Sequence, residues 1–375
     1  MIAWKTACAA VACVLAASAA ASANPLTQSQ IRQIDQVAAR ALSAQHVSGI
    51  EIGIGRHGKL LYARGYGLRD RARRLPVTAH TIFPIGSITK QFTAAAVMEL
   101  VERGKVDLNA RVSRYLPDAP HGGEITVREL LDQTSGLPDY LENKPLLASI
   151  MAGTVRPQPI ARMIALVDGK PLHFKPGTKY EYSNTNYALA GMLIARVSGM
   201  SYPQFLERTI FAPQHFSAMQ YLRTSVPSGT DVSRGYTYSK GTFVLLPPFA
   251  MDWGNAAGAL ASDANDLIRW DDAYFSGAII ALRAVRVATT PPRGIVMLAS
   301  KNRINNIGLG YAFGWVQARA EGRQMIWHNG GLPGARAMNA TFPRDGLDII
   351  VLTNATDADP ESVALKIARI IYDGR

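Results

Sequence analysis

The sequence predicts an α+β fold in which an antiparallel β-sheet is flanked by N- and C-terminal helices on its faces, with an inserted, mostly helical lobe. Strand-forming runs joined by short turns occur near both ends of the chain, and consecutive hairpins build antiparallel sheets. Helix signals dominate the stretch between them, and apolar residues recur with helical spacing at both termini. With 375 residues and 48% hydrophobic content, the chain can bury a large core.

The order of these signals divides the chain into parts. We expect residues 1–23 to be a removable signal peptide and residues 24–104 and 241–375 to build the sheet domain together. Residues 105–240 are expected to form the mostly helical lobe. Ligand sites favour the junctions between such units, so an active site is expected between the sheet and the lobe.

The N-terminal part carries a helix, a hairpin and a second helix. Apolar residues on one face predict the first helix over residues 28–42. Alternating apolar residues predict a hairpin over 49–67 that turns at 56–59. A second helix is expected to start near Ser87 and to stop at Gly104, because glycine ends helices.

Capping signals place the helices of the middle block. Thr126 and Ser201 each stand three residues before a glutamate or glutamine, the spacing of a capping box, so each is expected to open a helix. Another helix is predicted over residues 184–197, where it ends shortly before a glycine. Ser262 is expected to cap a helix over residues 263–274.

The C-terminal part returns to strands. β-rich runs cover residues 325–328, 335–342 and 347–352, and the four residues between the last two predict a hairpin turn. An Asp-Pro pair at 359–360 is expected to cap and start a final helix.

The first residues have the features of an export signal. Lys5 precedes a small or apolar run at residues 7–20, and Ala-Ser-Ala at 21–23 matches a signal cleavage site. The run is too short to cross a bilayer, so we expect a periplasmic or secreted protein with no stable membrane span after signal removal. Both cysteines, Cys8 and Cys13, lie in this segment, which excludes cysteine catalysis by the mature chain; a lipid anchor on either is the alternative.

The net charge of +12 indicates a basic surface. Its densest part is a run of four arginines with no interleaved aromatic residues: Arg69, Arg71, Arg73 and Arg74. That composition favours a solvated loop over a nucleic-acid site, so no nucleic-acid partner is expected. The oligomeric state is not indicated by any pattern in the sequence.

Ser87 and Lys90 form the first motif with catalytic chemistry. Residues three apart share a helix face, so the Lys90 amine is expected one turn from the Ser87 hydroxyl. A neighbouring amine can take or stabilise the proton that a nucleophilic serine must lose. The pair is equally compatible with a capping serine and a solvated lysine. It therefore supports a catalytic site only in combination with other motifs.

Two motifs later in the chain also carry residues suited to catalysis or substrate binding. Tyr182 is a candidate general base if a nearby cation lowers its pKa, and Asn184 could hydrogen-bond a substrate amide. His328 precedes Gly330 and Gly331, which would let a substrate lie against a strand edge. The Gly331 N–H, paired with the N–H of the nucleophile, could form an oxyanion hole. Each motif alone is also compatible with packing and capping roles.

Together and in this order, the three motifs resemble the penicillin-recognising serine hydrolases, which include class C β-lactamases and D-alanyl-D-alanine carboxypeptidases. That family has a serine-x-x-lysine, a tyrosine-x-asparagine and a lysine- or histidine-x-glycine. Residues 130–138, 176–177 and 257–260 also look familial, and the resemblance spans about residues 27–372. It implies a β-lactamase/transpeptidase-like fold, an acyl-enzyme, and catalytic roles for Ser87, Lys90, Tyr182 and His328.

Two positions depart from true class C β-lactamases. His328 stands where those enzymes usually carry lysine; it is expected to be neutral beside Lys90 and to link Tyr182 to the substrate as a hydrogen-bond donor. Tyr140 stands roughly where they place a glutamine that binds the acyl amide. The substrate-binding residues implied by the resemblance are therefore Asn184, Gly330, Gly331 and Tyr140.

The leading hypothesis is an exported D-alanyl-D-alanine carboxypeptidase-like peptidase or amidase. A class C-type β-lactamase or an esterase on the same fold is the alternative, and a penicillin-binding sensor or scaffold with little turnover is an alternative of another class. The partner is expected to be a small-molecule or peptide acyl substrate, such as a peptidoglycan-derived peptide or a β-lactam. No cofactor and no metal are expected, because no histidine pair has ligand spacing on a helix.

Overall fold

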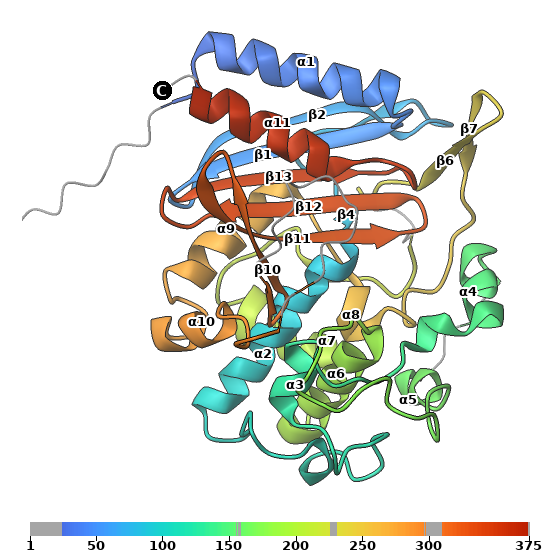
Figure 1. Cartoon of the computed structure of the whole chain (residues 1–375). Helices are drawn as coiled ribbons and strands as arrows, with labels where there is room; N and C mark the ends of the chain where they lie inside the picture. Colours follow the sequence, from blue (N-terminus) through green and yellow to red (C-terminus); the bar gives the residue numbers. More distant parts are fainter. Residues whose placement is uncertain are drawn as a thin grey trace, which may run out of the picture.

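The computed structural model describes residues 25–373 apart from 155, 157–158, 226–230, 296 and 298–309. The expected signal peptide, with Cys8 and Cys13, lies outside the described residues. Within them, a large antiparallel sheet has a pair of terminal helices on one face and a helical lobe below the other (Figure 1). The predicted α+β architecture is confirmed.

The main sheet has the strand order β3-β2-β1-β13-β12-β11-β10-β9. Its N-terminal hairpin pairs with the C-terminal strands from Ile50 opposite Thr353 to Arg56 opposite Leu347. The sheet is therefore assembled from both ends of the chain. Its strands are β1 (Gly49–Arg56), β2 (Lys59–Asp70), β3 (Leu75–Pro76), β9 (Gly310–Ala312), β10 (Trp315–Ala320), β11 (Arg323–Leu332), β12 (Ala335–Phe342) and β13 (Leu347–Thr353).

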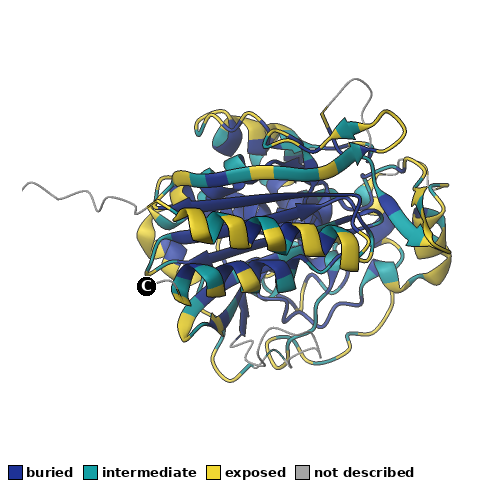
Figure 2. Cartoon of the chain, turned by 90° about the horizontal axis from the view of Figure 1, so that it is seen from above, coloured by how far each residue is buried: buried dark blue, intermediate teal, exposed yellow. Residues whose placement is uncertain are grey.

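The two terminal helices cover the outer face of this sheet, side by side, with their exposed residues turned outward (Figures 1 and 2). α1 (Gln28–Ala44) begins at a capping box made by Thr27, and α11 (Pro360–Asp373) begins after Asp359, whose carboxylate accepts from the N–H of Ser362 at 3.0 Å. Apolar residues of both helices pack with the residues of β1, β12 and β13 that face them, and together these side chains form one core cluster.

α9 (Ala264–Phe275) packs against the inner face of the sheet, so β1 and β13 are buried along their whole length. The approach is close because β1 carries glycines there: a Cβ added at Gly53 would lie 2.6 Å from Ala264, and one at Gly55 would lie 2.3 Å from Ile268. A strand buried on both faces carries mostly apolar or small residues, which explains the absence of polar alternation in β13; the buried Asp348 is the charged exception there.

The inserted segment supplies most of the helical lobe, and its capping signals are confirmed. Thr126 and Ser201 form capping boxes, and α6 ends at Gly199, which has a left-handed φ of 72°. The helices between the two parts of the sheet are α2 (Thr89–Glu102), α3 (Val127–Leu131), α4 (Lys144–Met151), α5 (Ile160–Ile164), α6 (Asn184–Ser198), α7 (Tyr202–Leu206), α8 (Asn255–Gly258), α9, and α10 (Leu282–Ala288).

The expected cap of α9 is wrong by one residue. Asp263, not Ser262, is the N-cap, because its carboxylate accepts from the N–H of Asp266 at 2.8 Å. Ser262 instead ends strand β8 (Leu260–Ser262). Both residues are good caps, and the strand pairing of β8 with β4 (Phe83–Pro84) decides between them.

A small hairpin crosses the boundary expected at residue 240. β6 (Tyr236–Ser239) and β7 (Thr242–Leu245) pair with each other and project beside the main sheet (Figure 1). The division into domains at this residue stays a prediction.

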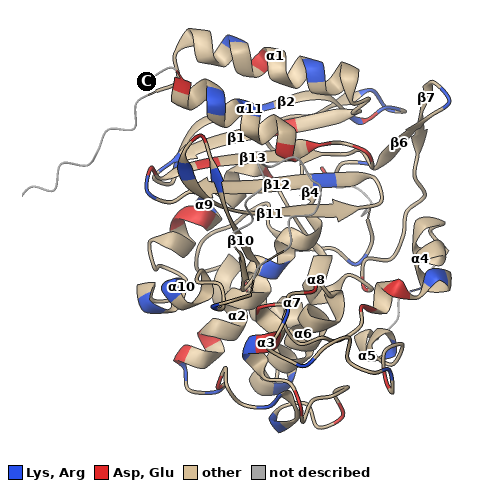
Figure 3. Ribbon diagram, in the orientation of Figure 1, with Lys and Arg blue, Asp and Glu red and all other residues tan. Residues whose placement is uncertain are grey.

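Figure 3 marks the positions of the lysines, arginines, aspartates and glutamates along the ribbon. Arg71, Arg73 and Arg74 are exposed in the turn after β2, as expected of a solvated loop, whereas Arg69 is partly buried and forms an ion pair with Asp231 at 2.7 Å. None of the helices in the described part of the chain is both long and apolar enough to cross a membrane.

Candidate active site

Ser87 lies at the junction of the sheet and the lobe. It occupies a short 3-10 turn, η1 (Gly86–Ile88), that leads directly into α2. The turn is tied to β8, because the N–H of Ile85 donates to the Leu260 carbonyl at 3.0 Å and the N–H of Leu260 donates to the Thr89 hydroxyl at 3.1 Å. The predicted helix start near Ser87 is therefore confirmed, with Lys90 one turn away.

Lys90 is fully buried, and its side-chain nitrogen has three polar neighbours. The Nζ atom lies 3.1 Å from the Ser87 Oγ, 2.9 Å from the Asn184 Oδ1 and 2.7 Å from the Ala257 carbonyl oxygen. Burial lowers the pKa of Lys90 to about 7, while the negative charge of Asp139 acts in the opposite direction. A substantial fraction of Lys90 is therefore a neutral amine near pH 7, which is the form that can accept a proton.

Tyr182 approaches Ser87 from another side. Its hydroxyl donates to the Ser87 Oγ at 2.7 Å, and its ring lies 4.7 Å from the Lys90 nitrogen. Burial raises the pKa of Tyr182 well above its ordinary value, although the hydrogen bond to Ser87 acts in the opposite direction. The condition under which Tyr182 could be the base, a pKa lowered by a nearby cation, is not met in this geometry, because desolvation of the phenolate dominates. Tyr182 is thus a protonated hydrogen-bond donor near neutral pH.

Residues 130–138 hold the Tyr182 segment in place. The Gln133 Oε1 accepts from the N–H of Ser183 at 3.0 Å and from the side-chain amide of Asn186 at 2.5 Å. The Pro138 carbonyl accepts from the hydroxyl of Thr185 at 2.7 Å. These buried contacts explain why this stretch and the tyrosine motif occur together: the first stretch satisfies the polar groups at the start of α6.

Asn184 connects the lysine to a carboxylate that the sequence reasoning missed. Its Oδ1 faces Lys90, while its backbone N–H and its Nδ2 donate to the Asp139 Oδ2 at 3.0 and 2.8 Å. Asn184 was expected to bind substrate, and that role stays a prediction; the contacts observed are those of a bridge between Asp139 and Lys90. No motif marked Asp139, since its partner is 45 residues away.

His328 is buried within β11, two residues before Gly330. Its Nδ1 lies 2.5 Å from the Asn329 carbonyl oxygen, which can only accept, so Nδ1 carries the proton and Nε2 is an acceptor. Nε2 faces the Tyr311 hydroxyl at 3.5 Å. Burial, with a smaller contribution from Lys90, lowers the pKa of His328 to about 3. The residue is neutral as expected, but its free nitrogen is an acceptor and not the donor that was expected.

Two glycines, Gly330 and Gly86, allow the turn that carries Ser87 to lie against β11. A Cβ added at Gly330 would lie 1.8 Å from the Ile85 carbonyl oxygen, and one at Gly86, which has a φ of +52°, would lie 2.8 Å from the Gly331 nitrogen. The backbone of Gly331 is therefore next to the turn that carries Ser87. This arrangement places two backbone segments where an oxyanion hole was expected; the assignment of its donors stays a prediction.

Tyr140 does not line the site. Its side chain is 0% exposed, and its hydroxyl donates to the Trp253 carbonyl at 2.5 Å. The expected contact between Tyr140 and a substrate is therefore corrected: this side chain packs in the core of the lobe. Its neighbour Asp139 instead contacts Asn184, whose amide oxygen faces Lys90.

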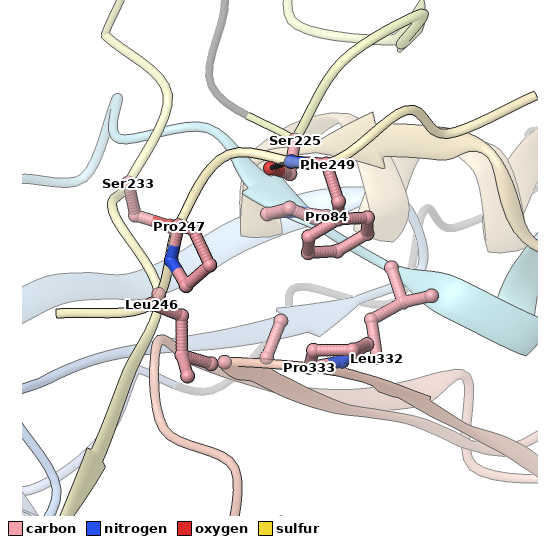
Figure 4. Close-up of a pocket in the computed structure, with 11 residues that line it drawn as sticks. Pro84, Ser225, Ser233, Leu246, Pro247, Phe249, Leu332 and Pro333 are labelled. Atoms are coloured by element: carbon pink, nitrogen blue, oxygen red, sulfur yellow. Dashed lines mark hydrogen bonds between the residues drawn. The ribbon is translucent and has the colours of Figure 1, made fainter. Parts of the chain in front are cut away.

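Two further features surround the site. Figure 4 shows a pocket beyond the end of β11 whose lining includes Pro84, Phe249 and Leu332. Its lining also includes Ser225 and Ser233, and none of Ser87, Lys90, Tyr182 and His328 lines it. Among the described residues, no cluster of three or more His, Cys, Asp or Glu side chains could hold a metal ion.

Comparison with known proteins agrees with this geometry. The Beta-lactamase family matches residues 34–372. Protein flp of Staphylococcus aureus (strain COL) is 28% identical over 341 residues, which cover 88% of this chain and 64% of that protein, so the chain spans just under two thirds of this relative's length.

Two solved structures are also similar. The octameric penicillin-binding protein homologue from Pyrococcus abyssi superposes with a TM-score of 0.82 at 27% identity, covering 92% of this chain and 77% of that one. The D-stereospecific amidohydrolase from Streptomyces sp. gives a TM-score of 0.76 at 25% identity, covering 91% and 99%.

The sheet-and-lobe fold and the three ordered motifs fit the family of penicillin-recognising serine hydrolases. The chain belongs to the Beta-lactamase family, as the three motifs had indicated.

Proposed function

We propose that this protein forms an acyl-enzyme on Ser87 and that, among the D-alanyl-D-alanine carboxypeptidase-like peptidases and amidases, it is an amidase that prefers substrates without a free carboxylate. One observation carries the proposal: the Ser87 Oγ lies 3.1 Å from the Lys90 Nζ and 2.7 Å from the Tyr182 hydroxyl. A nucleophile within hydrogen-bond reach of a base and of a separate proton donor is the arrangement that acyl transfer needs.

Lys90 is the general base in this proposal. A neutral amine has two N–H groups and one lone pair, and the acceptor oxygens of Asn184 and Ala257 occupy the two N–H groups. The lone pair then faces Ser87 and takes the hydroxyl proton as the Oγ attacks the substrate carbonyl carbon. The attack opens the carbonyl double bond, and the resulting oxyanion is assigned to the backbone N–H groups of Ser87 and Gly331.

Tyr182 is the proton donor to the leaving group. Its hydroxyl hydrogen-bonds the Ser87 Oγ, so it lies beside the bond that breaks. Collapse of the tetrahedral intermediate expels the amine or alcohol, which takes the Tyr182 proton, while the proton on Lys90 restores the phenol. Water then attacks the acyl-enzyme by the same sequence and releases the acid and free Ser87.

The neutral His328 favours amide or ester substrates over substrates held by a free carboxylate. A neutral imidazole whose free nitrogen is an acceptor repels a carboxylate, whereas a lysine at this position would attract one. The amidohydrolase neighbour supports D-amino-acid amides as the first class to test. The proposal includes export of the protein, on the basis of the signal-peptide features of residues 1–23.

A substrate panel tests the proposal. Purified protein should hydrolyse a D-amino-acid amide and a short p-nitrophenyl ester faster than a diacyl-D-Ala-D-Ala peptide or nitrocefin. Ser87→Ala should abolish turnover, whereas Ser43→Ala, at an exposed serine of α1, should not. Turnover retained in Ser87→Ala would overturn the nucleophile, and preference for nitrocefin would favour the β-lactamase alternative. Acylation without turnover of any substrate would favour the sensor.

A further inference from the structure

Asp139 lies behind the catalytic groups and contacts none of the atoms assigned to the reaction. It is the N-cap of η3 (Tyr140–Glu142), where its Oδ1 accepts from the N–H of Leu141 at 2.9 Å. Its Oδ2 accepts from both the backbone N–H and the Nδ2 of Asn184. One carboxylate oxygen is thus held by the turn that Asp139 caps, and the other oxygen binds Asn184 at the start of α6.

We propose that Asp139 is a positioning residue that fixes the amide orientation of Asn184 and thereby holds the Lys90 amine against Ser87. The inference rests on the proposed function, because it concerns the base of that reaction. Contacts form a continuous line from Asp139 through Asn184 and Lys90 to Ser87, with donor–acceptor distances of 2.8, 2.9 and 3.1 Å.

The orientation of the Asn184 amide decides what Lys90 meets. A carboxylate can only accept, so the amide nitrogen must face Asp139 and the amide oxygen must face Lys90. In the reverse orientation, an N–H group would face the Lys90 amine, which would lose an acceptor and be free to rotate its lone pair away from Ser87. Asp139 therefore excludes the unproductive orientation.

Asp139 also supplies charge. The groups that face the Lys90 nitrogen include Ser87, the rings of Tyr182 and Tyr187 at 4.7 and 5.6 Å, and the neutral His328. Of the carboxylates in the described residues, Asp139 is the one that raises the pKa of Lys90 against the effect of burial. Without that charge the pKa of Lys90 would fall, because a lone buried ammonium is costly.

Two variants separate these effects. Asp139→Asn keeps the size of the side chain and one acceptor oxygen but removes the charge. Asp139→Ala removes the charge and the acceptor oxygens. Glu142→Gln is the matched control, since it removes an exposed carboxylate from the same turn. The readout is the rate at which a fluorophosphonate probe phosphonylates Ser87, with loss of fluoride, followed by intact mass across pH. This step needs nucleophile activation and no particular substrate.

We expect Asp139→Ala to slow labelling about 10²-fold, the scale for a displaced catalytic group. Asp139→Asn should move the acidic limb of the labelling profile to lower pH, because the Lys90 pKa falls, whereas Glu142→Gln should leave the limb in place. A purely structural role would lower the melting temperature without moving the limb. If Asp139→Ala does not fold, the position of the acidic limb in Asp139→Asn tests the proposal by itself.

The outcomes are distinguishable. An unchanged limb in folded Asp139→Asn, with wild-type protein labelled normally, overturns the role of Asp139 alone. A wild-type protein that never labels at Ser87 overturns both this inference and the proposed function.

Discussion

The Tyr182 hydroxyl lies 2.7 Å from the Ser87 Oγ, although 95 residues separate the two in the chain. The contact joins the first turn before α2 to the segment before α6. It places a protonated phenol on the nucleophile, and it separates the roles of Tyr182 and Lys90, because burial raises the pKa of the first and lowers that of the second. The predictions below follow from that separation and from the packing around it.

Lys90 should set the pH dependence of acylation. Its pKa is about 7 and only the neutral amine can act as base, so kcat/KM should rise with pH through about 7 and then level. His328, with a pKa of about 3, contributes no limb in this range. Lys90→Ala should lower kcat/KM about 10²–10⁴-fold and remove the limb. A limb that persists in this variant would belong to another group.

Tyr182→Phe removes the proton donor but leaves the base. We expect a loss of about 10²–10⁴-fold for an amide substrate and a smaller loss for a p-nitrophenyl ester, whose leaving group needs no proton. The acidic limb from Lys90 should stay. Comparing both substrates across pH in wild type and variant tests this. Equal losses for both substrates would show that Tyr182 acts on the nucleophile and not on the leaving group.

His328→Lys should change substrate preference. A lysine at this position would offer a positive charge where the neutral imidazole offers none, so kcat/KM for nitrocefin, which carries a carboxylate, should rise relative to a neutral ester. The ratio is measured at one pH in wild type and variant. A lower or unchanged ratio in a folded variant would show that His328 does not set the carboxylate preference.

Gly330→Ala should disrupt the junction between β11 and the nucleophile turn. The added methyl group would lie 1.8 Å from the Ile85 carbonyl oxygen, so one backbone segment must move. We expect a lower melting temperature and loss of Ser87 labelling. Gly123→Ala is the control, because a Cβ there meets nothing within 4 Å. Wild-type labelling in Gly330→Ala would mean that the turn and the strand tolerate separation.

Asp348→Asn should reduce the loss of stability between about pH 5 and pH 8. Burial raises the pKa of Asp348, which interacts with buried Asp271, so the native protein keeps a proton that the unfolded chain releases above about pH 4. Stability from this group is thus full at low pH and falls as pH rises. The melting temperature should decline less from about pH 5 to pH 8 in Asp348→Asn than in wild type or in Asp118→Asn, an exposed control. Equal declines would contradict a protonated native Asp348.

The sequence by itself determined what depends on near neighbours in the chain. Capping boxes at Thr126 and Ser201 and the Ser87–Lys90 spacing involve residues three apart, so helix geometry alone relates them. The three motifs, in their order along the chain, indicated the family, whose model matches residues 34–372. The consecutive hairpin signals indicated the antiparallel sheet, because strands joined by short turns pair in opposite directions.

The tertiary structure alone decided what depends on distant partners. Asp139 contacts Asn184, whereas the side chain of its neighbour Tyr140 is buried in the lobe core. Successive side chains point in different directions from the backbone, so the motif position alone could not show which of the two lies near the site. The same holds for the raised pKa of Tyr182, since desolvation is a sum over every segment packed around the phenol and no single motif contains it.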